Sequence, residues 1–74
     1  MGAWSGRGMS EAEALALQQA FVVRNRGLTQ YEDSNLQATI DEFTRARELA
    51  AVAHNVSMED ESRFWLGVTV SLTI

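Results

Sequence analysis

Apolar and polar positions alternate with the period of a helix through the middle of the chain, between Leu36 and Ala53. The apolar stripe consists of Leu36, Ile40, Phe43, Arg47 and Ala50, with the arginine as its one polar interruption. The opposite, polar face consists of Asp41, Thr44, Arg45 and Glu48. Since residues three and four apart fall on one side of a helix, the pattern predicts a helix over 34–53. Such a helix is not stable alone in water, so its stripe must pack against another part of the chain.

A second helix is predicted over 10–26. Ser10 and Glu13 have the spacing of a capping box, in which each side chain binds the backbone N–H of the other residue. Basic residues occupy the last predicted turn, as the helix dipole favours. Gly27 follows, and glycine commonly ends a helix in the left-handed conformation. The segment 28–32 is therefore expected to be a connector.

Similar patterns mark the start of the central helix and the start of a third helix. Ser34 and Gln37 have the spacing of another capping box at the start of the central helix. Ser57 and the acidic residues 59–61 place a capping side chain and negative charge at the start of a third helix. This third helix is predicted over 57–72.

The C-terminal segment 67–74 has an alternative interpretation. Its sequence, GVTVSLTI, alternates strictly between apolar and hydroxyl side chains, which is typical of a strand. No second strand candidate exists in the chain, so a lone strand would leave its backbone groups unpaired unless another molecule supplied them. A helix is favoured for this reason. The alternative is two helices followed by a strand at 67–74, pairing between chains in a small structural homodimer.

Length and composition limit the class of protein. The chain has 74 residues, no cysteine and a net charge of −4, which predicts one small domain over 10–74, preceded by a flexible tail over 1–9. The acidic balance argues against nucleic acid or an anionic membrane as partner. No apolar stretch reaches the roughly 20 residues of a membrane span. Without a recognisable secretory signal, a cytoplasmic location is expected.

No residue pattern indicates catalysis. His54 is the only histidine, and without a second histidine or a cysteine it cannot anchor a typical zinc site. Glu59, Asp60 and Glu61 are contiguous, so on a helix they point in three directions and form no paired-carboxylate site. We therefore expect no enzyme activity, no catalytic or metal-ligating residues and no cofactor.

The central helix resembles the second helix of a tetratricopeptide repeat, in which bulky and small residues recur as in Ile40-x-x-Phe43-x-x-Ala46. Leu66-Gly67 resembles the Leu-Gly pair that opens the next repeat. The resemblance extends over 14–72, about one and a half repeats. Three positions depart from the family pattern: Thr39 replaces a small alanine, Ala51 stands where proline is expected, and Leu17-Gln18 replaces the first Leu-Gly pair.

The resemblance implies an all-α scaffold for protein–protein contacts, in which stacked helices bind a peptide or partner protein, possible partners including a second copy of the chain. Aromatic residues and arginine dominate binding hot spots, so the expected partner-binding residues are Trp4, Tyr31, Arg47 and Trp65. The expected core residues are Leu17, Phe21, Leu36, Ile40, Phe43, Leu49, Phe64 and Leu66.

Overall fold

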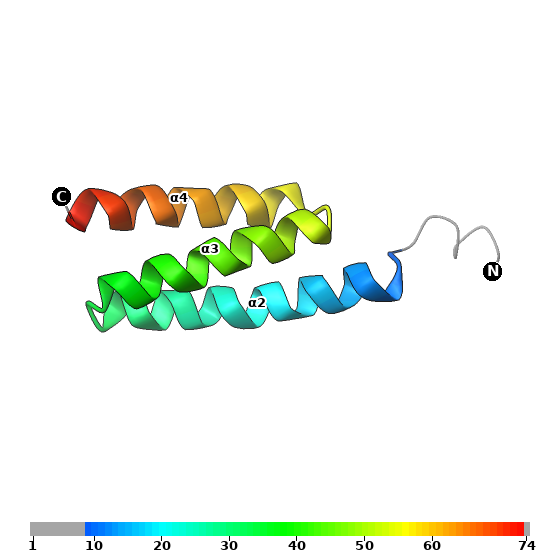
Figure 1. Cartoon of the computed structure of the whole chain (residues 1–74), viewed down its shortest axis with the longest axis horizontal. Helices are drawn as coiled ribbons and strands as arrows, with labels where there is room; N and C mark the ends of the chain where they lie inside the picture. The colour runs from blue at the N-terminus through cyan, green and yellow to red at the C-terminus, as the bar shows by residue number, and fades with distance from the viewer. Residues whose placement is uncertain (1–8, 74) are drawn as a thin grey trace.

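A computed structural model describes residues 9–73 of the chain. It contains three helices, α2 (Glu11–Glu32), α3 (Leu36–Val52) and α4 (Val56–Thr73). Each helix runs antiparallel to the next, so α2 and α4 are parallel to each other (Figure 1). The predicted all-α fold of three helices is confirmed. The strand alternative is wrong for 67–73, because this segment continues α4 without a break.

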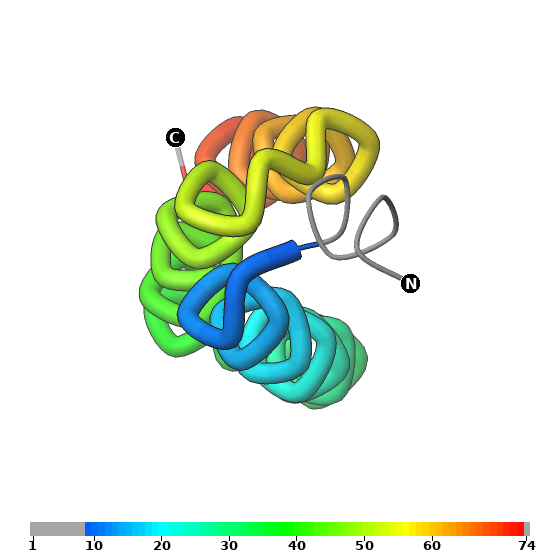
Figure 2. Tube along the Cα trace, turned by 90° about the vertical axis from the view of Figure 1, so that its right-hand side faces the viewer, coloured from blue at the N-terminus to red at the C-terminus, as the bar shows by residue number. Residues whose placement is uncertain are grey.

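The three helices form a curved layer. Helix α3 packs along both α2 and α4, whereas contact between α2 and α4 themselves is slight. Seen along the helix axes, α2 and α4 lie on the same side of α3 (Figure 2). None of the helices within residues 9–73 is both long and apolar enough to cross a lipid bilayer.

Helix α2 does not end at Gly27, as the sequence suggested. The glycine is buried within the helix, which continues for more than another turn to Glu32, so the predicted connector 28–32 is helical. A Cβ atom on Gly27 would lie 2.8 Å from Cε2 of Phe43. The glycine therefore serves the close approach of α2 to α3, and the contact with α3 stabilises the helix beyond it.

Turns of the same kind join α2 to α3 and α3 to α4. Ser34 has φ 62° and His54 has φ 56°, and each is followed by an asparagine. The Asn35 side chain accepts a hydrogen bond from the Ala38 N–H at 3.4 Å, and the Asn55 side chain accepts one from the Met58 N–H at 3.0 Å. Each left-handed residue thus ends one helix, and the asparagine after it begins the next.

These turns correct two predicted helix starts. Asn35, not Ser34, caps α3, and α4 begins at Val56, one residue before the predicted Ser57. The predicted capping box at the start of α2 is confirmed. There the Glu13 N–H donates to the Ser10 hydroxyl at 3.1 Å, and the Ser10 N–H donates to the Glu13 carboxylate at 2.9 Å.

Small residues dominate the interface between the helices. Beyond Phe43, the buried residues are Ala16, Ala20, Val23, Gly27, Thr39, Ala46, Ala50, Ala53, Met58, Ser62 and Thr69. Of the predicted core, Phe43 is confirmed as fully buried. Half-buried positions are Leu17, Leu36, Ile40, Leu49 and Leu66. Placing Phe21 and Phe64 in the core was wrong: both are exposed, because close packing on small residues keeps the buried face of each helix narrow.

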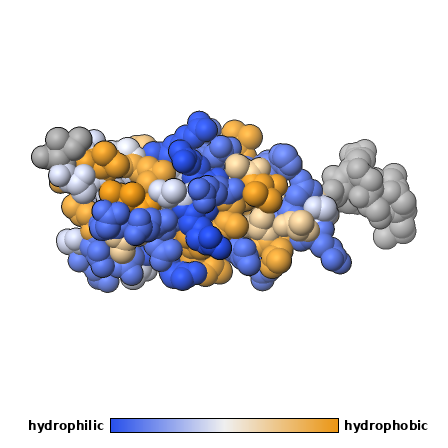
Figure 3. Space-filling model, in the orientation of Figure 1, coloured by the Kyte–Doolittle hydropathy of each residue, from blue (hydrophilic) through white to orange (hydrophobic). Residues whose placement is uncertain are grey.

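Hydrophobic surface remains on the outside of the layer. On the face where α3 lies in front, a hydrophilic belt crosses the middle of the molecule between hydrophobic areas towards its two ends (Figure 3). The most exposed large apolar side chains include Leu15, Val22, Val52, Val56 and Leu72. Three helices in a single layer thus leave much apolar area in contact with water, as expected for so small a chain.

Candidate partner-binding surface

One ion pair links α2 to α4, whose backbones make little contact with each other. Arg24 Nη1 lies 2.9 Å from Glu61 Oε2, and both side chains are partly buried. The Nε atom of Arg24 is also buried, and it has no hydrogen-bond partner among residues 9–73. We call the surface around this pair the α2–α4 seam; its residues are Phe21, Arg24, Tyr31, Glu61, Phe64 and Trp65.

Exposed aromatic rings flank the ion pair on both helices. The guanidinium carbon of Arg24 lies 5.7 Å from the centre of the Phe21 ring, within the range of a cation–π contact. Phe64 follows Glu61 by three residues, so it lies one turn further along the same side of α4. Phe21 is 44% exposed and Phe64 is 62% exposed. The seam therefore presents two large apolar rings to solvent beside a charged pair.

Trp65 is the centre of an aromatic cluster that connects all three helices. Its ring centroid lies 5.1 Å from that of Tyr31 on α2, in edge-to-face geometry. It lies 5.9 Å from the ring of Phe43 on α3, nearly parallel to it, and 5.5 Å from Phe64, again edge to face. The buried Phe43 thus supports the half-buried Trp65, which in turn supports the exposed Phe64.

The structure brings together two of the four predicted partner-binding residues, Tyr31 and Trp65. Arg47 lies on α3 and is half-buried; no carboxylate among residues 9–73 lies within the 4.0 Å of an ion pair from it. The fourth, Trp4, lies outside the described residues.

Sequence reasoning missed Phe21, Arg24, Glu61 and Phe64 as surface residues of one site. A local signal exists, because each helix carries a phenylalanine three residues from a charged residue. The signal is weak in isolation. Arg24 and Glu61 are 37 residues apart along the chain, and only the packing of α2 and α4 on the same side of α3 makes the two pairs neighbours.

A second charged contact lies at the end of the molecule where α2 begins. His54 Nε2, in the turn between α3 and α4, lies 3.2 Å from Glu13 Oε2. The hydrogen bonds from Ser10 hold the pKa of the Glu13 carboxyl below its usual value of 4.5, and His54 contributes less. Among residues 9–73, no three acidic or histidine side chains gather closely enough to hold a metal ion. The Glu13–His54 contact thus belongs to the capped start of α2, where Ser10 and Glu13 form the capping box.

The fold and the seam define a small all-α domain with an aromatic surface across two parallel helices. Comparison of the chain with protein-family models, curated proteins and solved structures gave no match.

Proposed function

We propose that the chain is a protein–protein interaction module of the helical-repeat type, without catalytic activity, and that the α2–α4 seam binds the partner. The observation that carries this proposal is the exposure of Phe21 and Phe64 on either side of the Arg24–Glu61 pair. Aromatic residues, phenylalanine among them, and arginine are enriched in the buried centre of protein interfaces. Apolar groups gathered beside polar ones are typical of interfaces that bury an apolar centre within a polar rim.

The seam is also preorganised. Arg24 is held by Glu61 and by the ring of Phe21, and Phe64 rests on Trp65. A surface whose side chains are already ordered loses less conformational entropy on binding than a flexible one. A partner that presents apolar side chains to Phe21 and Phe64 would remove both rings from water.

The packing of α2 on α3 supports the helical-repeat type. Phe43 and Ala46, two residues of the repeat-like pattern, are fully buried, and so is Thr39, which stands at the small-residue position. In repeat arrays each unit buries its apolar face against its neighbours. The order of contacts here, α2 on α3 and α3 on α4, follows that scheme.

The test is a peptide selection followed by matched substitutions. Peptides are selected on the purified protein from a random library, and their affinity is measured for the wild type and for the double variant Phe21→Ala, Phe64→Ala. The control is Leu15→Ala, Val52→Ala, which removes apolar side chains of similar exposure away from the seam. We expect the seam variant alone to lose at least about tenfold in affinity, a modest value for two hot-spot residues. Equal binding by the two variants would disprove the seam as the site.

A structural homodimer assembled through the C-terminal segment is the second candidate. Pairing as a strand is excluded for 67–73 by the helical conformation. Association through helix α4 is favoured by the exposure of Val70 and Leu72 near its end. Sedimentation of the wild type and of a Val70→Ser, Leu72→Ser variant tests this candidate, because a dimer of this kind would dissociate in the variant. A wild type that sediments as a monomer would exclude it.

A further inference from the structure

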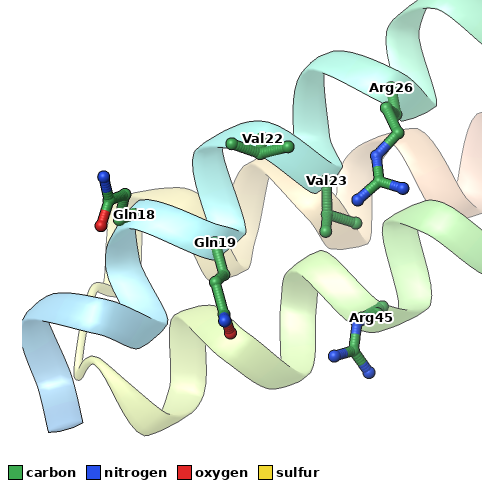
Figure 4. A pocket seen from close by; sticks show the side chains of 6 residues that line it. All are labelled: Gln18, Gln19, Val22, Val23, Arg26 and Arg45. Atoms are coloured by element: carbon green, nitrogen blue, oxygen red, sulfur yellow. The ribbon is translucent and has the colours of Figure 1, made fainter.

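A pocket of about 290 Å³ lies between α2 and α3, away from the α2–α4 seam. Its lining residues are Gln18, Gln19, Val22, Val23, Arg26 and Arg45. Five of these residues belong to α2 and one belongs to α3 (Figure 4). The two arginines lie on different helices: the Arg26 side chain extends towards α3 beside Val23, and the Arg45 side chain starts on α3 and extends away from α2 (Figure 4).

The charge of this pocket is opposite to that of the whole chain. Its two charged lining groups are both guanidinium groups, whereas the protein carries a net charge of −4. The arginines are also weakly neutralised. Arg26 Nε lies 4.0 Å from Glu42 Oε2, at the limit of an ion pair, and no carboxylate among residues 9–73 lies within that distance of Arg45. Arg24 and Arg63, by contrast, have carboxylate partners at 2.9 and 3.3 Å.

The remaining lining adds an apolar surface and amide groups. Val22 is apolar and 51% exposed, so contact with an apolar group of a ligand would favourably remove its side chain from water. Gln19 extends towards α3 one turn before Val23 (Figure 4). The pocket thus combines an apolar surface, hydrogen-bonding amides and two planar cations suited to carboxylates.

We infer that this pocket binds an acidic peptide segment, with carboxylates on Arg26 and Arg45 and an apolar side chain against Val22. The segment belongs to a partner protein, so the inference extends the proposed interaction function to a second surface. It does not depend on the seam, because the two surfaces share no residue. The net negative charge of the protein gives no long-range attraction for such a partner, so short-range contacts with the two arginines must supply the selectivity.

The probe is the peptide acetyl-Glu-Leu-Glu-amide, with acetyl-Gln-Leu-Gln-amide as its neutral match. Each peptide is titrated into the labelled full chain at low salt, and the backbone signals and arginine Nε–H signals are followed by NMR. We expect saturable shifts at Arg26, Arg45 and Val22, with the acidic peptide the tighter ligand. A gain of about threefold per exposed charge pair corresponds to the usual strength of such pairs.

Two variants test the assignment. The double variant Arg26→Gln, Arg45→Gln should bind both peptides equally, while the control Arg63→Gln, on α4, should keep the preference for the acidic peptide. Unchanged backbone spectra of both variants would verify that they are folded. Equal affinity of the wild type for the two peptides would overturn the inference, and so would peptide shifts that fall outside the pocket.

Two further arms separate other sources of the same signal. Inorganic phosphate at equal concentration should shift the two arginines less than the acidic peptide does; an equal or larger response would indicate a general anion site and overturn the peptide assignment. The Phe21→Ala, Phe64→Ala variant should retain peptide binding at the pocket. A negative result for the seam proposal would therefore not change the peptide binding measured at the pocket. Loss of the preference for the acidic peptide in the Arg26→Gln, Arg45→Gln variant would likewise be an effect of the pocket and not of the seam.

Discussion

The ring of Phe43 lies directly against the backbone of Gly27, so close that a Cβ atom on the glycine would be 2.8 Å from Phe43 Cε2. The indole ring of Trp65 stacks on the same phenylalanine, with centroids 5.9 Å apart. Phe43 thus lies between α2 and α4, and its position determines the spacing of both helices from α3. The α2–α4 seam depends on this contact, because Phe64 packs on Trp65.

Substitution of the two helical glycines should change stability in opposite directions. In Gly27→Ala the added methyl group must displace the Phe43 ring or separate the helices, and overpacking of this kind costs about 1–3 kcal/mol. In Gly67→Ala the methyl group meets open space, and alanine is the better helix former by about 1 kcal/mol. Urea unfolding followed by circular dichroism measures both. A Gly27→Ala protein as stable as Gly67→Ala would show that the helices do not approach so closely.

Removal of the Ser62 hydroxyl should stabilise the protein. This hydroxyl is fully buried and has no hydrogen-bond partner among residues 9–73, and an unsatisfied buried group costs about 1–3 kcal/mol. Ser62→Ala should therefore raise the free energy of unfolding by about 1 kcal/mol. The control is Thr69→Val, seven residues later on the same helix face, where the hydroxyl donates to the Trp65 carbonyl at 2.7 Å. That substitution should destabilise, and the reverse order of the two would contradict the burial described.

The left-handed residue between α2 and α3 offers a third test. Ser34 has φ 62°, a conformation that costs a side-chain-bearing residue about 1–2 kcal/mol. Ser34→Gly should remove this cost, with part of the gain offset by the greater flexibility of glycine in the unfolded chain, for a net stabilisation of about 0.5–1 kcal/mol. The same replacement at the exposed helical position Ser71 should lower the melting temperature. A loss of stability at both positions would argue against the left-handed turn.

The capping box predicts a pH dependence of stability in acid. The bonds from Ser10 lower the pKa of Glu13 in the folded state below its usual 4.5, so the folded protein holds this proton less tightly than the unfolded chain. The stabilisation is complete above the unfolded pKa and is lost as the pH falls through the lower folded pKa. Melting temperatures measured from pH 6 down to pH 3 should fall more steeply for the wild type than for Glu13→Gln. Glutamine preserves the capping geometry, so parallel curves would exclude this contribution.

Local patterns predict the first two helices and the start of the third, because apolar periodicity and helix caps act between residues close in the chain. The alternation at 67–74 indicates a strand instead, and a helix is favoured there only because the chain offers no second strand. The Ser10–Glu13 cap and the burial of Phe43 followed from such local patterns. Local patterns predicted the helix boundaries less accurately. Gly27 has the local character of a helix end, yet the free energy of packing against Phe43 keeps it inside α2.

The tertiary structure decided which aromatic residues are buried and which are exposed. Periodicity places Phe21 and Phe64 among apolar neighbours, but it does not say how wide the buried face of each helix is. Close packing on small residues makes that face narrow, so both rings remain in solvent, and the placement of α2 and α4 on one side of α3 gathers them around Arg24 and Glu61. Helix formation is thus determined by neighbours in sequence, whereas the binding surface depends on contacts between residues distant in the chain, whose energies no local pattern contains.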